Sequence, residues 1–214
     1  MQYQQYIIAT GGVGVGKSTL IQNFIKTLHK DEYIFIQEYV DYNPIKAKKE
    51  LEETLKGNGS VFLFQKNIIE CYKQQLKKSK NRKYVIMERS PADSINIFAA
   101  ASYRNGKMTK IEFDELLNDV EKLCDEFNIP RLNECYFRKI DSCQYSISEV
   151  FNIVKNDIEI NKEKNKSCLF LLYCSDPLKQ KNNIEKRGRP EEKDYDIGYM
   201  IRVNNEYHAL FAGY

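Results

Sequence analysis

A glycine-rich run near the N-terminus has the residue types and spacing that bind phosphate. Gly11 is followed after four residues by Gly16, Lys17 and Ser18, and the short apolar run Tyr6–Ala9 precedes them. Glycines let the backbone turn back so that its N–H groups face phosphate oxygens, and the N-terminus of a following helix adds its dipole. This P-loop pattern predicts that Lys17 reaches the β- and γ-phosphates of a nucleotide and that the Ser18 hydroxyl binds Mg²⁺. The nucleotide-binding residues would be Gly11, Gly12, Val13, Gly14, Val15, Gly16, Lys17, Ser18 and Thr19.

Two carboxylates stand at the ends of other apolar runs. Glu38 follows Tyr33–Ile36, and Glu88 follows Tyr84–Met87 and precedes Arg89. Because ligands bind beyond the carboxyl ends of parallel strands, we expect both carboxylates beside the P-loop. Glu88 is a candidate ligand of Mg²⁺, directly or through water, and Glu38 is a candidate general base. Taken alone, each also fits an ordinary strand-end carboxylate or a surface ion pair.

Two arginines near the C-terminus form a third cluster. Arg187 and Arg189 flank Gly188 and are followed by Pro190 and two glutamates. Arginines on either side of a flexible glycine can reach over a transferring phosphoryl group and stabilise its charge. Alone, the run equally fits an exposed charged loop.

Alternating strands and helices must position these residues. Strands are expected at Tyr6–Ala9, Tyr33–Ile36, Tyr84–Met87 and Cys168–Tyr173. Helices are expected at about 17–29, 45–56, 61–78, 91–102, 111–127, 177–186 and 197–211. This alternation predicts an α/β fold with a parallel sheet of about five strands, flanked by helices on both faces. Residues 129–166 fit a strand at 136–140 and a helix at 147–160, with no evident chemistry.

Composition limits the class of protein. A length of 214 residues predicts one domain, and 33 Lys+Arg against 30 Asp+Glu give a net charge of +3, too small for a dedicated nucleic-acid binder. The six cysteines form no C-x-x-C pair, which argues against structural zinc and favours reduced thiols in the cytoplasm. We expect no signal peptide and no membrane span, because no stretch of 18 apolar residues occurs.

These clusters together resemble the deoxynucleoside kinase family. The similarity rests on the P-loop, Glu38, Gln65, Glu88-Arg89-Ser90, Phe98 and Arg187-x-Arg189, and covers about 6–102 and 168–211. The chain is similar, less closely, to thymidylate kinases. The resemblance implies one P-loop kinase domain over residues 1–214, with an arginine-containing lid at about 181–194. It also implies transfer of the γ-phosphoryl of ATP to the 5′-hydroxyl of a deoxynucleoside with Mg²⁺, in nucleotide salvage, by a homodimer.

The resemblance assigns a role to each matching residue. Glu38 would accept the proton of the 5′-hydroxyl, Arg89 would hold that hydroxyl, and Gln65 would pair with the base edge. Phe98 would stack on the base, Phe64 would line its pocket, and Glu192 would meet the sugar 3′-hydroxyl. The catalytic set is Lys17, Glu38, Arg89, Arg187 and Arg189. Without the family, Phe64, Gln65 and Phe98 fit core packing or solvation equally well.

The chain departs from the family pattern in its substrate pocket. It has no Trp, so Tyr42 is the expected aromatic beside the base. The family's earlier lid arginine falls on Asn183, with Lys181 and Lys186 as substitutes, and its sugar-binding tyrosine falls near Thr54. Tyr72 and Ser94 fall where members that favour cytosine or purines carry Arg and Asp, although Asp93 is the immediate neighbour. This pattern leans toward pyrimidines.

The separation of Glu88 and Arg187 is longer than the family leads us to expect, which predicts an insertion around 129–166. Two other functions stay open. A thymidylate-type nucleoside monophosphate kinase would need further cationic groups for the acceptor phosphate, and a non-catalytic nucleotide-binding P-loop module would bind ATP without turnover.

Overall fold

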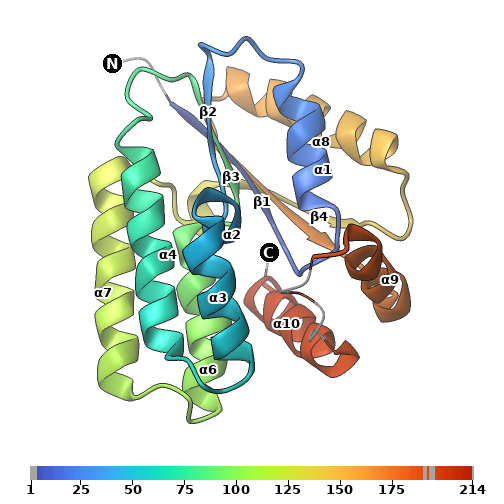
Figure 1. Ribbon diagram of the computed structural model, residues 1–214. Coiled ribbons are helices and arrows are strands. Elements are labelled where there is room, and N and C mark those ends of the chain that lie inside the picture. The colour runs from blue at the N-terminus through green and yellow to red at the C-terminus, as the bar shows by residue number, and fades with distance from the viewer. Residues whose placement is uncertain (1–3, 190–191, 193–195, 214) are drawn as a thin grey trace.

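The computed structural model describes residues 4–189, 192 and 196–213. The described residues form a parallel sheet with the strand order β2-β3-β1-β5-β4. The strands are β1 (Gln5–Thr10), β2 (Tyr33–Ile36), β3 (Tyr84–Glu88), β4 (Tyr136–Asp141) and β5 (Cys168–Tyr173). Helices cover both faces of this sheet (Figure 1), which confirms the expected α/β P-loop kinase fold.

Side chains alternate along β1 between two separate cores. Ile7 and Ala9 belong to the core under α1 (Lys17–Ile25) and α8 (Ile147–Glu163). Tyr6 and Ile8 belong to the core on the opposite face. Because successive side chains of a strand point to opposite faces, a fully buried strand of this kind needs helices on both sides.

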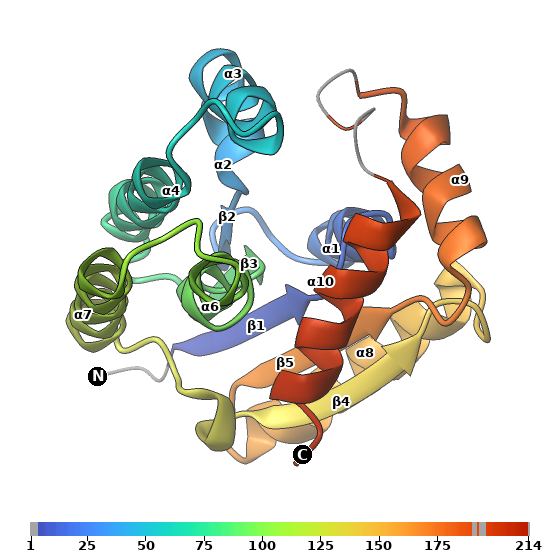
Figure 2. The same ribbon diagram turned by 90° about the horizontal axis from the view of Figure 1, so that it is seen from below.

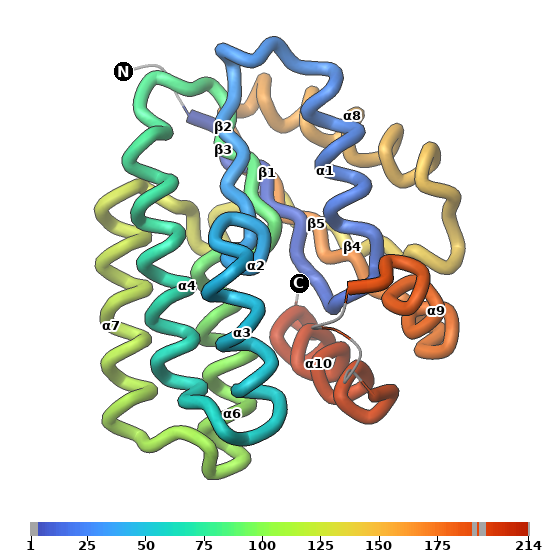
Figure 3. Tube along the Cα trace, viewed as in Figure 1, coloured from blue at the N-terminus to red at the C-terminus, as the bar shows by residue number. Residues whose placement is uncertain are grey.

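A second group of helices covers the opposite face of the sheet. They are α4 (Val61–Leu76), α5 (Pro91–Asp93), the π-helical segment η1 (Ser94–Ala99), α6 (Ala100–Arg104), α7 (Lys110–Phe127) and α10 (Ile197–Leu210). The short α2 (Tyr39–Tyr42) and α3 (Pro44–Leu55) follow β2 and pack against α4, as the chain trace in Figure 3 shows. Neither α2 nor the π-helical segment was expected from the sequence.

Polar residues set the helix boundaries. The Ser60 hydroxyl caps the start of α4 by accepting from the Leu63 N–H. Thr109 caps α7 and Ser146 caps α8 in the same way, each accepting from the N–H three residues later. Asp176 caps α9 (Pro177–Arg187), which ends at Gly188 in the left-handed conformation. α1 stops at Ile25, short of the expected His29, where Thr27 N–H donates to the Phe24 carbonyl in a tighter turn.

Residues 129–166 form an integral part of this sheet. They contain the short 3₁₀ helix η2 (Leu132–Glu134), strand β4 and helix α8. β4 pairs with β5 in parallel from Tyr136 opposite Cys168 to Asp141 opposite Tyr173. The segment that the sequence left without chemistry therefore supplies an edge strand and the helix that packs on α1.

All six cysteines are free thiols. The Sγ atoms of Cys143 and Cys174 lie 3.1 Å apart just beyond the ends of β4 and β5, a neighbourhood that their spacing in the sequence does not reveal. Among the described helices, none has the length and apolar character needed to cross a membrane.

Candidate active site

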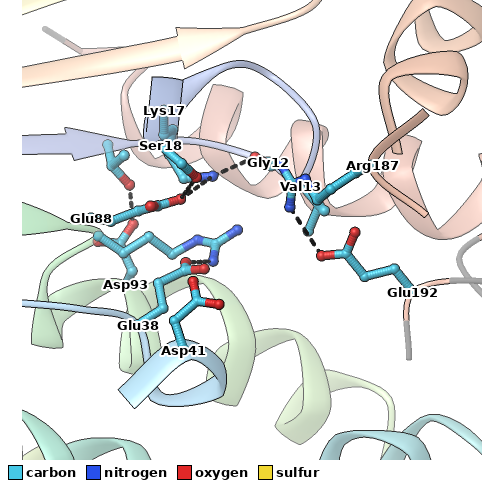
Figure 4. A network of polar contacts seen from close by, with 12 residues as sticks. Gly12, Val13, Lys17, Ser18, Glu38, Asp41, Glu88, Asp93, Arg187 and Glu192 are labelled. Atoms are coloured by element: carbon cyan, nitrogen blue, oxygen red, sulfur yellow. Dashed lines mark hydrogen bonds and ion pairs between the residues drawn. The ribbon is translucent and has the colours of Figure 1, made fainter. Parts of the chain in front are cut away.

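Three adjacent strands deliver the candidate site to one edge of the sheet. The P-loop follows β1, Glu88 is the last residue of β3, and Glu38 follows β2 by two residues. β2, β3 and β1 are neighbours in the sheet, so the expected convergence of these groups is observed. Figure 4 shows Lys17, Ser18, Glu38 and Glu88 around one space, with Arg187 and Glu192 across from them.

The P-loop presents backbone N–H groups without internal acceptors. Gly14 and Gly16 have φ of 77° and 100°, a conformation that L-residues with a Cβ rarely adopt. In the described part of the chain, no carbonyl or side chain accepts from the N–H groups of residues 12–16. Gly16 also begins α1, so the helix N-terminus adds its partial positive charge. The loop is therefore built to bind an anion.

Lys17 is buried at the centre of this loop. Its ammonium donates to the Gly12 carbonyl at 2.7 Å and lies 3.7 Å from Glu88 Oε1. Burial and the nearby positive charge of Arg89 lower the pKa of Lys17 to about 8. Thr19, on the first turn of α1, is exposed to solvent, unlike Lys17.

Ser18 and Glu88, the two residues expected to bind Mg²⁺, are in direct contact. The Ser18 hydroxyl donates to Glu88 Oε1 at 3.0 Å. Burial and the charge of Glu38 raise the pKa of Glu88. No cluster of three or more His, Cys, Asp or Glu side chains suited to a metal occurs within the described ranges. A hydroxyl and one carboxylate fit Mg²⁺, which is commonly bound through one or two protein oxygens with phosphates and water completing its shell.

Glu38 and Arg89 form a partly buried ion pair beside Lys17. Burial works to raise the pKa of Glu38, but the charges of Arg89, Lys17 and Arg187 outweigh it and hold the pKa below its usual value. Arg89 has φ of 61°, and its N–H donates to the Ala9 carbonyl at 2.9 Å. Such a conformation in a residue other than glycine is typical of functional sites.

Arg89 contacts two aromatic side chains, of which the sequence assigned a role only to Phe98. Its Nε donates to the Tyr207 hydroxyl at 3.3 Å, and its guanidinium lies 5.4 Å from the centre of the Phe98 ring. Tyr207 comes from α10, 118 positions away in the chain. The expected contact between Arg89 and Glu38 is therefore observed, and Phe98 and Tyr207 lie against the same guanidinium.

Asp93 is engaged by the protein itself. One carboxylate oxygen accepts from the Thr10 hydroxyl, and the other accepts from the Ser90 N–H at 2.6 Å and the Ser90 hydroxyl at 3.0 Å. These contacts fasten the start of α5 to the end of β1. Ser94, at the position where some family members are expected to carry Asp, is a small neutral residue.

A cavity of about 580 Å³ adjoins these charged groups. It is lined by Lys17, Glu38, Glu88 and Arg89 at one end, and by the expected pocket residues Phe64, Gln65, Tyr72, Ser94, Phe98 and Glu192. Thr54, Arg187 and Val13 also line it. Gln65 is 3% exposed, and its Oε1 has no hydrogen-bond partner among the described residues. A buried amide in this state is suited to bind a polar ligand.

Tyr42 does not line this cavity, so the expectation for that residue is corrected. It is half-buried and packs against the small cluster of Tyr39, Ala47, Phe64 and Cys71, because α2 begins directly after Glu38 and takes the chain into a helical turn. Tyr39 and Tyr199 are the additional aromatic lining residues. Tyr39 could have been predicted, because it directly follows Glu38, but nothing in the sequence indicated Tyr199.

The two C-terminal arginines are tied to carboxylates. Arg187 Nη1 donates to Glu192 Oε1 at 3.0 Å, and Arg189 Nη2 donates to Asp41 Oδ1 at 3.1 Å. Arg187 and Glu192 line the cavity, whereas Arg189 does not. Of the expected lid at 181–194, residues 190–191 and 193–194 lie outside the described residues. Asn183, at the position of the missing arginine, donates to the Gly14 carbonyl at 3.0 Å, and Lys181 lies 3.8 Å from Glu185.

Comparisons with known proteins identify the family and support the fold. The family model described as deoxynucleoside kinase matches residues 7–161, so the chain belongs to the deoxynucleoside kinase family. A solved structure of deoxyadenosine kinase from M. mycoides with bound dATP is similar in fold, with a TM-score of 0.61 and 20% sequence identity. That similarity covers 98% of this chain and 85% of the other. No curated protein sequence matches the chain.

Proposed function

We propose that the protein transfers the γ-phosphoryl group of ATP to the 5′-hydroxyl of a deoxynucleoside. The observation that carries this proposal is a single cavity lined by both halves of such a reaction. Lys17 and Arg187 bring positive charge from the P-loop and from α9, while the Glu38–Arg89 pair and the Gln65 amide face the same space. Family membership supports the same reaction class.

The donor side holds and neutralises phosphate oxygens. The N–H groups of the P-loop bind them, the Lys17 ammonium reaches the terminal phosphates, and Arg187 stabilises charge on the transferring group. Phosphoryl transfer asks little covalent chemistry of a protein, so positioning and charge stabilisation account for its catalysis. Ser18 and Glu88 would hold Mg²⁺, which when bound neutralises charge on the β- and γ-phosphates.

The acceptor side orients the hydroxyl and takes its proton. Glu38 is ionised at neutral pH because its pKa is lowered, so its carboxylate accepts the hydrogen of the 5′-hydroxyl. Arg89 fixes that carboxylate through the ion pair and donates a hydrogen bond to the oxygen of the 5′-hydroxyl. A weakly basic carboxylate suffices here, because in a loose transition state the acceptor oxygen has formed little bond to phosphorus.

The pocket beyond Arg89 is proposed to bind the nucleoside base, with a preference for pyrimidines. Gln65 offers one acceptor and two donors, which suit a base edge, and Phe98 offers a ring face. Tyr72 and Ser94 are neutral, and both oxygens of Asp93 are already used by Thr10 and Ser90. Asp93 also lines the cavity, but because its oxygens already accept hydrogen bonds within the protein, it is a weaker acceptor for the exocyclic amino group of a purine or cytosine.

An acceptor panel tests the proposal. Purified protein is incubated with γ-labelled ATP, Mg²⁺ and each of the four deoxynucleosides or their 5′-monophosphates. We expect label on at least one deoxynucleoside, with thymidine ahead of the purines. Label on monophosphates alone would favour a thymidylate-type kinase, and tight ATP binding without transfer would favour a nucleotide-binding module. A purine-only profile would refute the pyrimidine preference and leave the reaction standing.

We further propose that this reaction serves nucleotide salvage in the cytoplasm and that the protein acts as a homodimer. These three statements rest on family membership. Light scattering of the purified chain measures the oligomeric state directly, and a mass near 25.2 kDa would refute the dimer.

A further inference from the structure

Three consecutive carbonyls of the P-loop accept hydrogen bonds from side chains. Gly12 O accepts from Lys17 Nζ at 2.7 Å, Val13 O accepts from Gln180 Nε2 at 2.6 Å, and Gly14 O accepts from Asn183 Nδ2 at 3.0 Å. The two amide donors both come from α9, more than 160 positions later in the chain. The loop is thus anchored to a helix that its own sequence motif does not include.

A third amide supports this contact from α10. Asn204 Nδ2 donates to Gln180 Oε1 at 2.8 Å, and Gln180 is fully buried. Only the NH₂ group of an amide can donate, so Gln180 is fixed with its nitrogen toward Val13 and its oxygen toward Asn204. α9 and α10 pack side by side in both Figure 1 and Figure 2, which brings the two amides together.

Two glycines of the loop make this approach sterically feasible. A Cβ at Gly12 would lie 2.6 Å from Asn204 Oδ1 and 3.0 Å from Gln180 Nε2. A Cβ at Gly14 would lie 2.8 Å from Ile184 Cγ1 and 2.9 Å from the Gln180 carbonyl oxygen. Both glycines are therefore needed for contact with α9 and α10, in addition to their place in the phosphate-binding motif.

The anchored carbonyls determine where the loop's N–H groups point. In a planar trans peptide the C=O and the following N–H point in opposite directions. Holding Val13 O and Gly14 O against α9 therefore turns the N–H groups of Gly14 and Val15 away from that helix. These N–H groups have no acceptor among the described residues, so they remain available to phosphate oxygens.

The anchoring residues share one face of α9 with Arg187. Gln180, Asn183 and Arg187 are spaced three and four residues apart, which places them on the same side of a helix. Fixing the first two against the P-loop therefore fixes the direction in which Arg187 leaves the helix. Arg187 reaches the cavity that Lys17 and Glu38 line.

We propose that Gln180 and Asn183 are positioning residues that orient the P-loop and Arg187 relative to each other, and that Asn204 acts through Gln180. The proposal rests on the proposed function for its catalytic meaning, but the effect on nucleotide affinity does not depend on turnover. Because Asn183 stands where the family pattern has an arginine, this chain uses the position to orient the loop through a hydrogen bond instead of a charge.

The test compares binding of ATP with Mg²⁺ to wild-type protein and variants by titration calorimetry, alongside thymidine binding and thermal unfolding. We expect Asn183→Ala and Gln180→Leu each to weaken ATP affinity by about tenfold, the effect of losing one oriented hydrogen bond. Thymidine affinity should change less than about twofold. Asn182→Ala is the matched control, because Asn182 is exposed on the same helix and makes no contact with the loop among the described residues.

Asn204→Ala distinguishes an action through Gln180 from a separate packing role. Alone it should weaken ATP affinity several-fold, and in the Gln180→Leu background it should add almost nothing, because coupled groups are not additive. Additive losses would refute the role assigned to Asn204. Unchanged ATP affinity in folded Asn183→Ala, or equal losses for ATP and thymidine, would overturn the proposal. If Gln180→Leu does not fold, the exposed Asn183→Ala still decides. Absence of phosphoryl transfer with the expected affinity changes would refute the proposed function alone.

Discussion

Replacing Gln65 with leucine distinguishes a binding role from a packing role, because the two roles predict opposite changes in stability. Gln65 lies on α4, is 3% exposed, and has an Oε1 atom without a hydrogen-bond partner among the described residues. A buried amide that serves the fold would be hydrogen-bonded within the protein, as the large majority of buried side-chain polar atoms are. We therefore predict that Gln65 completes its hydrogen bonds when a ligand is bound.

The expected magnitudes follow from that unmet group. Leaving a buried polar group unsatisfied costs about 1–3 kcal/mol, so Gln65→Leu should raise the unfolding free energy of the ligand-free protein by about 1 kcal/mol. For a chain of this size the melting temperature would rise by about 2–4 °C. Two lost hydrogen bonds to the base, each contributing about 0.5–1.5 kcal/mol, should lower kcat/KM for the nucleoside by about 10- to 100-fold.

Gln75 provides the matched control on the same helix. It is buried to the same degree, but its amide accepts from the Gln37 N–H and donates to the Gln37 carbonyl, both at 2.9 Å. Gln75→Leu should therefore lower stability by about 1–3 kcal/mol and leave the KM for the nucleoside nearly unchanged. Calorimetric unfolding and steady-state kinetics measure both quantities. A Gln65→Leu variant that is destabilised like Gln75→Leu, with unchanged nucleoside kinetics, would refute the binding role.

Three further predictions concern the groups around the Glu38 carboxylate. Glu38→Gln should lower single-turnover phosphoryl transfer at least about a hundredfold while ATP affinity stays unchanged, and full activity in the folded variant would contradict this. Tyr207→Phe removes the hydroxyl that accepts from Arg89 Nε, so kcat/KM for the nucleoside should fall about 5- to 10-fold with the KM for ATP unchanged. Because neighbouring cations lower the pKa of Glu38, its base form persists as pH falls, and protonation of Glu38 reduces activity only below the usual glutamate pKa of about 4.3. The Arg187→Ala variant should lose activity at a higher pH than the wild type, and an identical acidic limb in pH–rate profiles of the two proteins would argue against the charge effect of Arg187.

Local patterns predicted the parts of the fold that depend on neighbouring residues. The run from Tyr6 to Phe24 specifies a buried strand, a turn that only glycines adopt easily, and an amphipathic helix. All three are present. The apolar runs before Glu38 and Glu88 likewise predicted a strand before each of these carboxylates. Alternation of strands and helices then implied a parallel sheet, although it did not specify the strand order.

Contacts between distant residues could not be predicted in this way. Tyr207 reaches Arg89 across 118 positions, and Gln180 reaches Val13 across 167, so no local pattern marks either pair. The short helix after Glu38, to which the sequence analysis assigned no element, packs Tyr42 against the Tyr39 cluster. The π-helical turn at 94–99 lies inside a segment whose apolar spacing looks like an ordinary helix.

The position of the transferred phosphoryl group tests the central claim most directly. Protein, ATP labelled in its γ-phosphoryl group, Mg²⁺ and the best deoxynucleoside acceptor are incubated, and the product is located by phosphorus NMR and mass spectrometry. We predict a deoxynucleoside 5′-monophosphate that carries the label on its 5′-oxygen and is formed in step with ADP. Release of labelled inorganic phosphate without a nucleotide product, or label only on an added monophosphate, would contradict the reaction proposed here.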